Sequence, residues 1–225
     1  MSRGLGHRAN VNTRQISSFT YVNFVTSSAG SITVPTGIQN GDIAFLIDGN
    51  ADASASKPQP AGTVSAWPLV NYTSGRDDGN EVTYHAYINY RILNGTEGNT
   101  SVSLTDGSSV DRKALIIFRP NIVTRYTPAF LDIAAETTIN TPSNQTINAS
   151  GNRTPLIVFT HFWGGVGAAV STMTASDNIF NGSSDRQQVG YKIYNYGQSA
   201  IDITVTKNDQ GENNVLQSFY FKPIY

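Results

Sequence analysis

Apolar and polar residues alternate over short stretches along most of the chain, and such alternation is typical of half-buried β-strands. The longest stretch runs from Val82 to Leu93, with Tyr87 on the more polar of its two faces. Continuous apolar runs at 43–47 and 114–118 are typical of strands buried on both faces. No window shows the 3.6-residue apolar period of an amphipathic helix, although 110–118 and 133–138 each have room for one helical turn.

Turn-forming pairs separate these stretches, at Asn40-Gly41, Asp78-Gly79, Asn94-Gly95 and Asp106-Gly107. Successive strands joined by tight turns pair antiparallel. The sequence therefore predicts an all-β fold, an antiparallel β-sandwich of jelly-roll or immunoglobulin-like type over residues 16–225.

The second half of the chain repeats the strand pattern of the first. Phe118-Arg119-Pro120 ends one apolar strand, and Phe221-Lys222-Pro223 ends another 103 residues later. We predict two pseudo-repeated halves, 16–122 and 127–225, which form one large sandwich or two small ones packed together. Chance similarity between two β-rich segments is the alternative.

Composition removes several classes of protein. The chain has 225 residues and no cysteine, which excludes disulfide frameworks, thiolate metal sites and cysteine nucleophiles. Charged residues make up only 14% of it and the net charge is −1. Surfaces that bind nucleic acid or anionic membranes carry a large basic excess, so we expect neither partner. No apolar stretch is long enough to cross a bilayer and no secretory signal is visible, so we expect a soluble protein.

Residues 1–15 differ from the rest, because they carry Arg3, His7, Arg8 and Arg14 and no acid. We interpret them as an extended docking arm whose arginines lie on an acidic patch of a partner. A disordered terminus is the alternative. Removing the three arginines from the net charge of −1 leaves −4 on the body.

One stretch has the oxygen-ligand spacing of a calcium loop: Asp48, Asn50 and Asp52. Ala53 stands where that loop needs glycine, and Gln59 stands where it needs a bidentate glutamate. We therefore predict a polar turn after a buried strand, with calcium as the weaker alternative and no cofactor.

Motifs of nucleophilic catalysis, zinc hydrolysis and phosphate binding do not occur in the sequence. His85 and His161, the candidate general bases, both lie in expected strands. We interpret His85 as part of a polar sheet face and His161 as a partly buried, hydrogen-bonded histidine. We predict that the protein is not an enzyme; a polysaccharide hydrolase, with two distant carboxylates brought together, is a further hypothesis.

Aromatic side chains are the remaining candidates for recognition. Trp163 precedes Gly164 and Gly165, and this glycine-rich loop is the predicted exposed surface for a ligand or partner. Cross-strand packing is the expected role of most other candidate rings, which are Trp67, Tyr87, Tyr194 and Tyr196.

Short motifs follow one another in a fixed order: Val34-Pro35, Gly41-Asp42, Pro60-Ala61-Gly62 with Trp67, Tyr87–Leu93 and Phe118-Arg119-Pro120. Together they resemble a widespread group of β-sandwich proteins in the virions of tailed bacteriophages, over roughly residues 16–225. Gly62 and Trp67 are separated here but adjacent in that group, so this corner is expected to be built differently.

The resemblance implies a virion surface component, such as a capsid decoration or a tail or fibre protein, assembled in the host cytoplasm. It implies other virion proteins, major capsid or tail proteins, as partners, and no catalytic residues. We also expect a symmetric homo-oligomer. The alternative function is a carbohydrate-binding adhesin, a receptor-binding protein that recognises host surface glycans through loop aromatics.

Overall fold

The computed structural model describes residues 16–52, 67, 69–77, 82–103, 112–122, 131–139, 145–151, 155–163, 171–182, 187–207 and 215–223. These residues form strands and turns and no helix, which confirms the predicted all-β class. The segment at 133–138, where a helical turn had room, is a strand. No helix that is long and apolar enough to span a membrane occurs in the described ranges.

The first half of the chain contains β1 (Ile16–Ser27), β2 (Ser31–Thr33), β3 (Asn40–Asp52), β4 (Leu69–Asp77), β5 (Val82–Asn94), β6 (Ser101–Ser103) and β7 (Arg112–Ile122). The second half contains β8 (Leu131–Ile139), β9 (Gln145–Ile147), β10 (Leu156–Trp163), β11 (Ser171–Met173), β12 (Asn178–Asn181), β13 (Gln187–Tyr194), β14 (Ile203–Lys207) and β15 (Val215–Pro223). Asn40-Gly41, predicted as a turn, instead opens β3 at an irregularity in the strand register.

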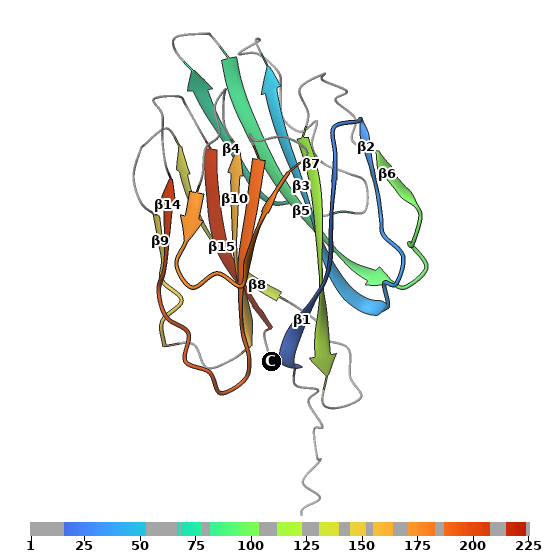
Figure 1. Cartoon of the computed structure of the whole chain (residues 1–225), viewed down its shortest axis with the longest axis vertical. Helices are drawn as coiled ribbons and strands as arrows, with labels where there is room; N and C mark the ends of the chain where they lie inside the picture. Colours follow the sequence, from blue (N-terminus) through green and yellow to red (C-terminus); the bar gives the residue numbers. More distant parts are fainter. Residues whose placement is uncertain are drawn as a thin grey trace, which may run out of the picture.

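The strands form four antiparallel sheets stacked as layers (Figure 1). The two inner sheets have the orders β1-β7-β3-β5-β4 and β12-β13-β10-β15-β8. They share one apolar core, in which the ring of Phe45 lies 5.7 Å from that of Phe159 and 5.2 Å from that of Phe221. The outer sheets, β2-β6 and β11-β14-β9, each bury the far face of one inner sheet. The molecule is therefore one sandwich with an additional layer on each side.

The two inner sheets have the same strand order when β8, β15, β10, β13 and β12 are matched with β1, β7, β3, β5 and β4. Their registers also correspond. Ile43 of β3 pairs with Phe118 of β7, and Ile157 of β10 pairs with Phe221 of β15. Each phenylalanine begins one of the two Phe-Arg/Lys-Pro ends of the sequence.

The register on the other side of the central strands corresponds as well. Ile43 faces Ile92 of β5, and Ile157 faces Ile193 of β13. This places Tyr90-Arg91-Ile92 and Tyr191-Lys192-Ile193 at matching positions, and we call residues matched in this way equivalent. Ancestry by duplication remains a prediction, whereas the matching order and register are properties of the structure.

Candidate functional site

The predicted docking residues fall largely outside the part of the chain that the structure describes. Trp163 is the last residue of β10 and pairs in register with Gln187 and Val215. The predicted residues outside the described ranges are Arg3, His7, Arg8, Arg14, Gly164 and Gly165.

The point where the arm joins the body is held by both halves of the molecule. Ile16 is buried in the shared core, and the ring of Phe19 lies 6.0 Å from that of Phe221. The backbone N–H of Tyr196 donates a 2.9 Å hydrogen bond to the carbonyl oxygen of Ser17. The first described residues of the chain are therefore fixed to the core and to the loop after β13.

The candidate calcium loop is a strand, so the predicted polar turn is wrong. β3 continues through Asp52, and Asp48, Asn50 and Asp52 pair in register with successive residues of β5. An extended strand separates the first and last of these residues by roughly 13 Å, whereas a calcium loop folds around its ion. No group of three or more His, Asp or Glu side chains that could hold a metal occurs among the described residues.

Asp48 instead takes part in a buried ion pair. Its Oδ1 lies 3.7 Å from Nζ of Lys113, which is directly opposite on β7, and neither side chain has appreciable solvent exposure. Leu46 and Leu115 occupy the same apolar layer. Such a pair is costly to desolvate and very costly to break by removing one partner. Asp48 is therefore an internal structural residue.

The face of β5 that was expected to be polar is covered. Tyr87 and Asn89 are buried, and Nδ2 of Asn89 donates a 2.8 Å hydrogen bond to the carbonyl oxygen of Trp67. Trp67 belongs to the apolar cluster beneath β2-β6, and this outer layer is why the face is not solvated. The side chain of His85 lies outside the described set.

His161 is a structural histidine, as predicted, and it is fully buried rather than partly so. Its Nε2 lies 3.2 Å from Nε2 of Gln187. The two buried side chains therefore form a hydrogen-bonded pair. The role of His161 is to satisfy a buried polar group within the second inner sheet.

Asp42, near the start of β3, holds the segment that leads from β2 into β3. Its carboxylate accepts two hydrogen bonds from Arg119, at 2.7 Å from Nε and 2.8 Å from Nη2, and a third from the backbone N–H of Gln39 at 2.7 Å. The hydrogen bonds to Asp42, more than its charge, raise the pKa of Arg119, while burial opposes them. This bidentate pair closes the Val34–Asp42 connection onto β7.

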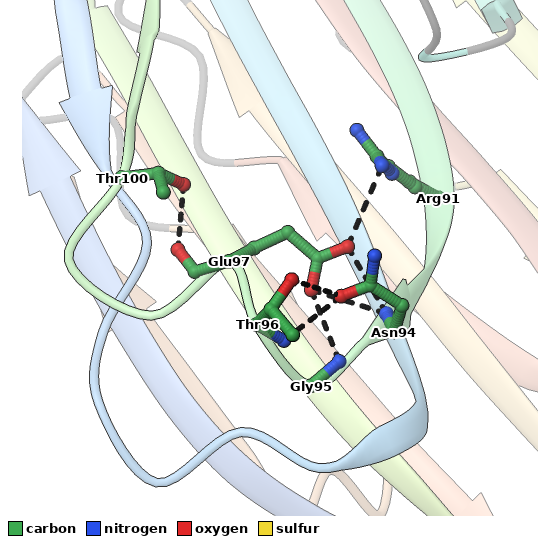
Figure 2. Close-up of polar contacts among 6 residues, drawn as sticks. All are labelled: Arg91, Asn94, Gly95, Thr96, Glu97 and Thr100. Carbon is green, nitrogen blue, oxygen red and sulfur yellow. Dashed lines mark hydrogen bonds and ion pairs between the residues drawn. The ribbon is translucent and has the colours of Figure 1, made fainter.

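Glu97 closes the loop after β5 (Figure 2). Its carboxylate accepts from the backbone N–H groups of Asn94 and Gly95 at 3.0 Å each and lies 3.4 Å from Nη2 of Arg91. Two exposed threonines complete the loop: Thr96 bonds to the side chain of Asn94, and Thr100 bonds to the carbonyl oxygen of Glu97. The predicted Asn94-Gly95 turn is therefore confirmed.

In the second half, the carboxylates of two aspartates also hold connections between strands in place. Asp177 accepts from Nζ of Lys192 at 2.6 Å and from the backbone N–H of Ile193 at 2.7 Å, which ties the start of β12 to β13. Asp202 accepts from the backbone N–H of Ser150 at 2.8 Å, and hydrogen bonding to Ser150 lowers its pKa. In both cases the carboxylate stabilises a connection between strands.

An aromatic stack joins the edges of the two inner sheets where β1 meets β12. The ring of Phe24 lies 4.5 Å from that of Phe180, and the ring of Tyr21 lies 5.4 Å from Phe180 and 5.5 Å from Tyr191. Burial, with smaller effects from the charges of Asp177 and Tyr21, raises the pKa of Tyr191 to about 12. The rings stack on one another, so this cluster holds the halves together.

Among the candidate rings whose side chains the structure describes, Trp67, Tyr87 and Tyr194 are buried and only Tyr196 is strongly exposed. It is 60% exposed, and Ile201 of the same loop is 49% exposed. Figure 1 shows the segment between β13 and β14 at the end of the molecule where β1 begins. Sequence analysis singled out Tyr196 but missed Ile201, which carries no sign that distinguishes it from a core residue.

An open groove of about 460 Å³ lies along the end of β1. β2 and Pro35 form its other wall, together with Asn99, which has a left-handed backbone conformation with φ of 63°. Its lining combines valine and isoleucine with serine, threonine and asparagine, and none of the described lining residues is charged. These properties suit a neutral, hydroxyl-rich ligand.

Comparisons of the chain with protein-family models, with curated proteins and with solved structures find no match.

Proposed function

We propose that this protein is a non-enzymatic structural component of a tailed-phage virion, a capsid decoration or a tail or fibre protein attached by its N-terminal arm. Its partners are other virion proteins, and it acts as a symmetric homo-oligomer. The resemblance of the sequence motifs to those of virion sandwich proteins supports this proposal, and so does the absence of cysteine, which suits assembly in a reducing cytoplasm.

The observation that carries the proposal is the root of the arm. Ile16 is in the core shared by both halves, and the carbonyl of Ser17 is bonded to the loop after β13. An anchor must transmit force to the whole body, and this one is tied to both inner sheets. The acids described above stabilise connections, which suits a protein whose task is to hold a shape.

We further propose that each half is a jelly roll. The order β1-β7-β3-β5 beside β2-β6 recurs as β8-β15-β10-β13 beside β9-β14. The first strand of each half neighbours the last, whereas in an immunoglobulin sheet the first strand neighbours the second. Jelly rolls occur in viral capsid and lectin domains, so the fold fits both candidate functions and does not choose between them.

Deleting residues 2–14 tests the attachment. We expect the truncated protein to fold, as circular dichroism reports, and to be lost from phage particles purified by density gradient. A variant with Arg3, Arg8 and Arg14 changed to lysine keeps the charge and is expected to be incorporated. Unchanged incorporation of the truncated protein contradicts attachment by the arm.

The alternative function is a carbohydrate-binding adhesin, and the uncharged groove beside β1 is the observation that favours it. Thr33→Arg places a charged side chain in that groove, and Trp163→Ala removes the ring that precedes the glycine-rich loop. A glycan array with the wild-type protein and both variants distinguishes the two sites. Absence of binding to host polysaccharide by the wild type argues against the adhesin.

A further inference from the structure

Two equivalent loops of the molecule share one internal design. In the loop after β5, the backbone N–H of Asn94 donates to Oε1 of Glu97 at 3.0 Å. In the loop after β13, the backbone N–H of Asn195 donates to Oε1 of Gln198 at 2.7 Å. The spacing is the same, and the loops follow equivalent strands.

The outward residues of the two loops differ. The loop after β5 exposes Thr96 and Thr100, whose hydroxyl groups both bond within the loop. The loop after β13 exposes Tyr196 at 60% and Ile201 at 49%. Gly95 and Thr100 occupy the positions equivalent to Tyr196 and Ile201, so the turn itself does not require large apolar residues there. An exposed tyrosine and isoleucine with no such structural need are available for contact with a partner, and tyrosine is enriched at interfaces.

The loop after β13 is also held in place. Tyr196 is bonded through its backbone N–H to Ser17, and Asp202 accepts from the N–H of Ser150. Ala200, between the two exposed residues, is buried in the outer apolar cluster. A loop fixed in this way loses little conformational entropy when it binds, which favours affinity.

We propose that Tyr196 and Ile201 are apolar anchors that dock this end of the molecule onto a protein partner, into an apolar pocket bordered by acidic residues. The inference rests on the proposed function and specifies the chemistry of its partner. In the sequence, Ser17 follows a segment that carries Arg3, Arg8 and Arg14 and no acid, and this positive charge favours carboxylates beside the pocket rather than a second basic surface.

The test uses full-length protein and phage particles assembled without it, with binding measured by co-sedimentation. The variant Tyr196→Thr/Ile201→Thr replaces both exposed apolar residues with the residue type that the loop after β5 exposes. We expect binding about 30-fold weaker than wild type, as for the loss of central anchor residues. Ile92→Thr is the matched control, because Ile92 is a 39% exposed apolar residue elsewhere, and its binding is expected to be unchanged.

The outcomes separate this inference from the proposed function. Failure of the wild type to bind the particles contradicts the proposed function. Equal binding by wild type and the double-threonine variant, with equal melting temperatures, overturns the anchor assignment alone. Binding abolished by nuclease treatment identifies nucleic acid as the partner and overturns it. A change in the variant's own oligomeric state, with particle binding intact, assigns the surface to self-association and also overturns it.

Discussion

The two halves share strand order and register, yet they differ in the residues placed at equivalent positions. Asp48 faces Lys113 across β3 and β7, whereas the equivalent positions on β10 and β15 pair Phe162 with Leu216. The same architecture therefore accepts either an ion pair or two apolar residues at this place. A buried ion pair at this place is a property of one half rather than a requirement of the fold.

The loops after β5 and β13 also differ in charge, and here too the charged pair is in the first half. Glu97 in the first half has Arg91 as a cationic neighbour, while Gln198 in the second half is neutral and Lys192 pairs with Asp177. In the second half, the turn after β13 is thus closed by an uncharged amide, and the loop exposes apolar side chains. The comparison locates the candidate contact surface in the second half, at the root of the arm.

The largest expected effect comes from the ion pair that only the first half contains. Lys113→Met leaves the buried carboxylate of Asp48 without its lysine and should lower the free energy of unfolding by about 3–5 kcal/mol. Asp48→Leu combined with Lys113→Met should recover most of that loss, because the second half is apolar at the equivalent place. Urea denaturation followed by tryptophan fluorescence measures both variants. A double variant as unstable as the single one contradicts the equivalence.

A smaller effect is expected at high pH from the aromatic stack. The folded state holds the phenol proton of Tyr191 until about pH 12, whereas the unfolded chain loses it near pH 10.0. Its contribution is therefore complete below pH 10 and declines as the pH rises towards 12, by on the order of 2 kcal/mol. Denaturation measured between pH 10 and 12 should show that the free energy of unfolding falls less with pH for Tyr191→Phe than for the wild type. Tyr90→Phe, at the equivalent position, is the control, and an equal change in both variants argues against the assignment.

The smallest effect is expected at the loop that Glu97 closes. Glu97→Gln should lower the free energy of unfolding by only about 0.5–1 kcal/mol, because Gln198 closes the equivalent loop with a neutral amide. Glu97→Ala removes the acceptor and should cost more. Thermal unfolding of the two variants shows which of them is less stable. If Glu97→Gln loses as much stability as Glu97→Ala, the charge of Glu97 matters and not its role as an acceptor.

Strand positions were predictable because alternation is a local property. The stretch from Val82 to Leu93 corresponds closely to β5, which ends one residue later. The prediction of a polar turn at Asp48–Asp52 was wrong, because a run of polar residues resembles a turn when the cross-strand partners are unknown. Register with β5 and β7 keeps this segment extended.

Which faces are buried was less predictable. Alternation assigns Tyr87 and Asn89 to one side of a strand, but it does not reveal a further layer above that side. The loops are an intermediate case: the spacing from Asn94 to Glu97 recurs from Asn195 to Gln198 in the sequence itself, and matching the halves residue by residue would have found it.

The sequence by itself determined the all-β class, the approximate strands and the basic character of the arm, because these follow from local periodicity, turn chemistry and charge. Tertiary structure decided that the halves share one core, that each inner sheet carries an outer layer, and that Tyr196 is exposed beside Ser17. These facts depend on contacts between residues far apart in the chain. No local pattern encodes such contacts, since burial is set by what packs against a face.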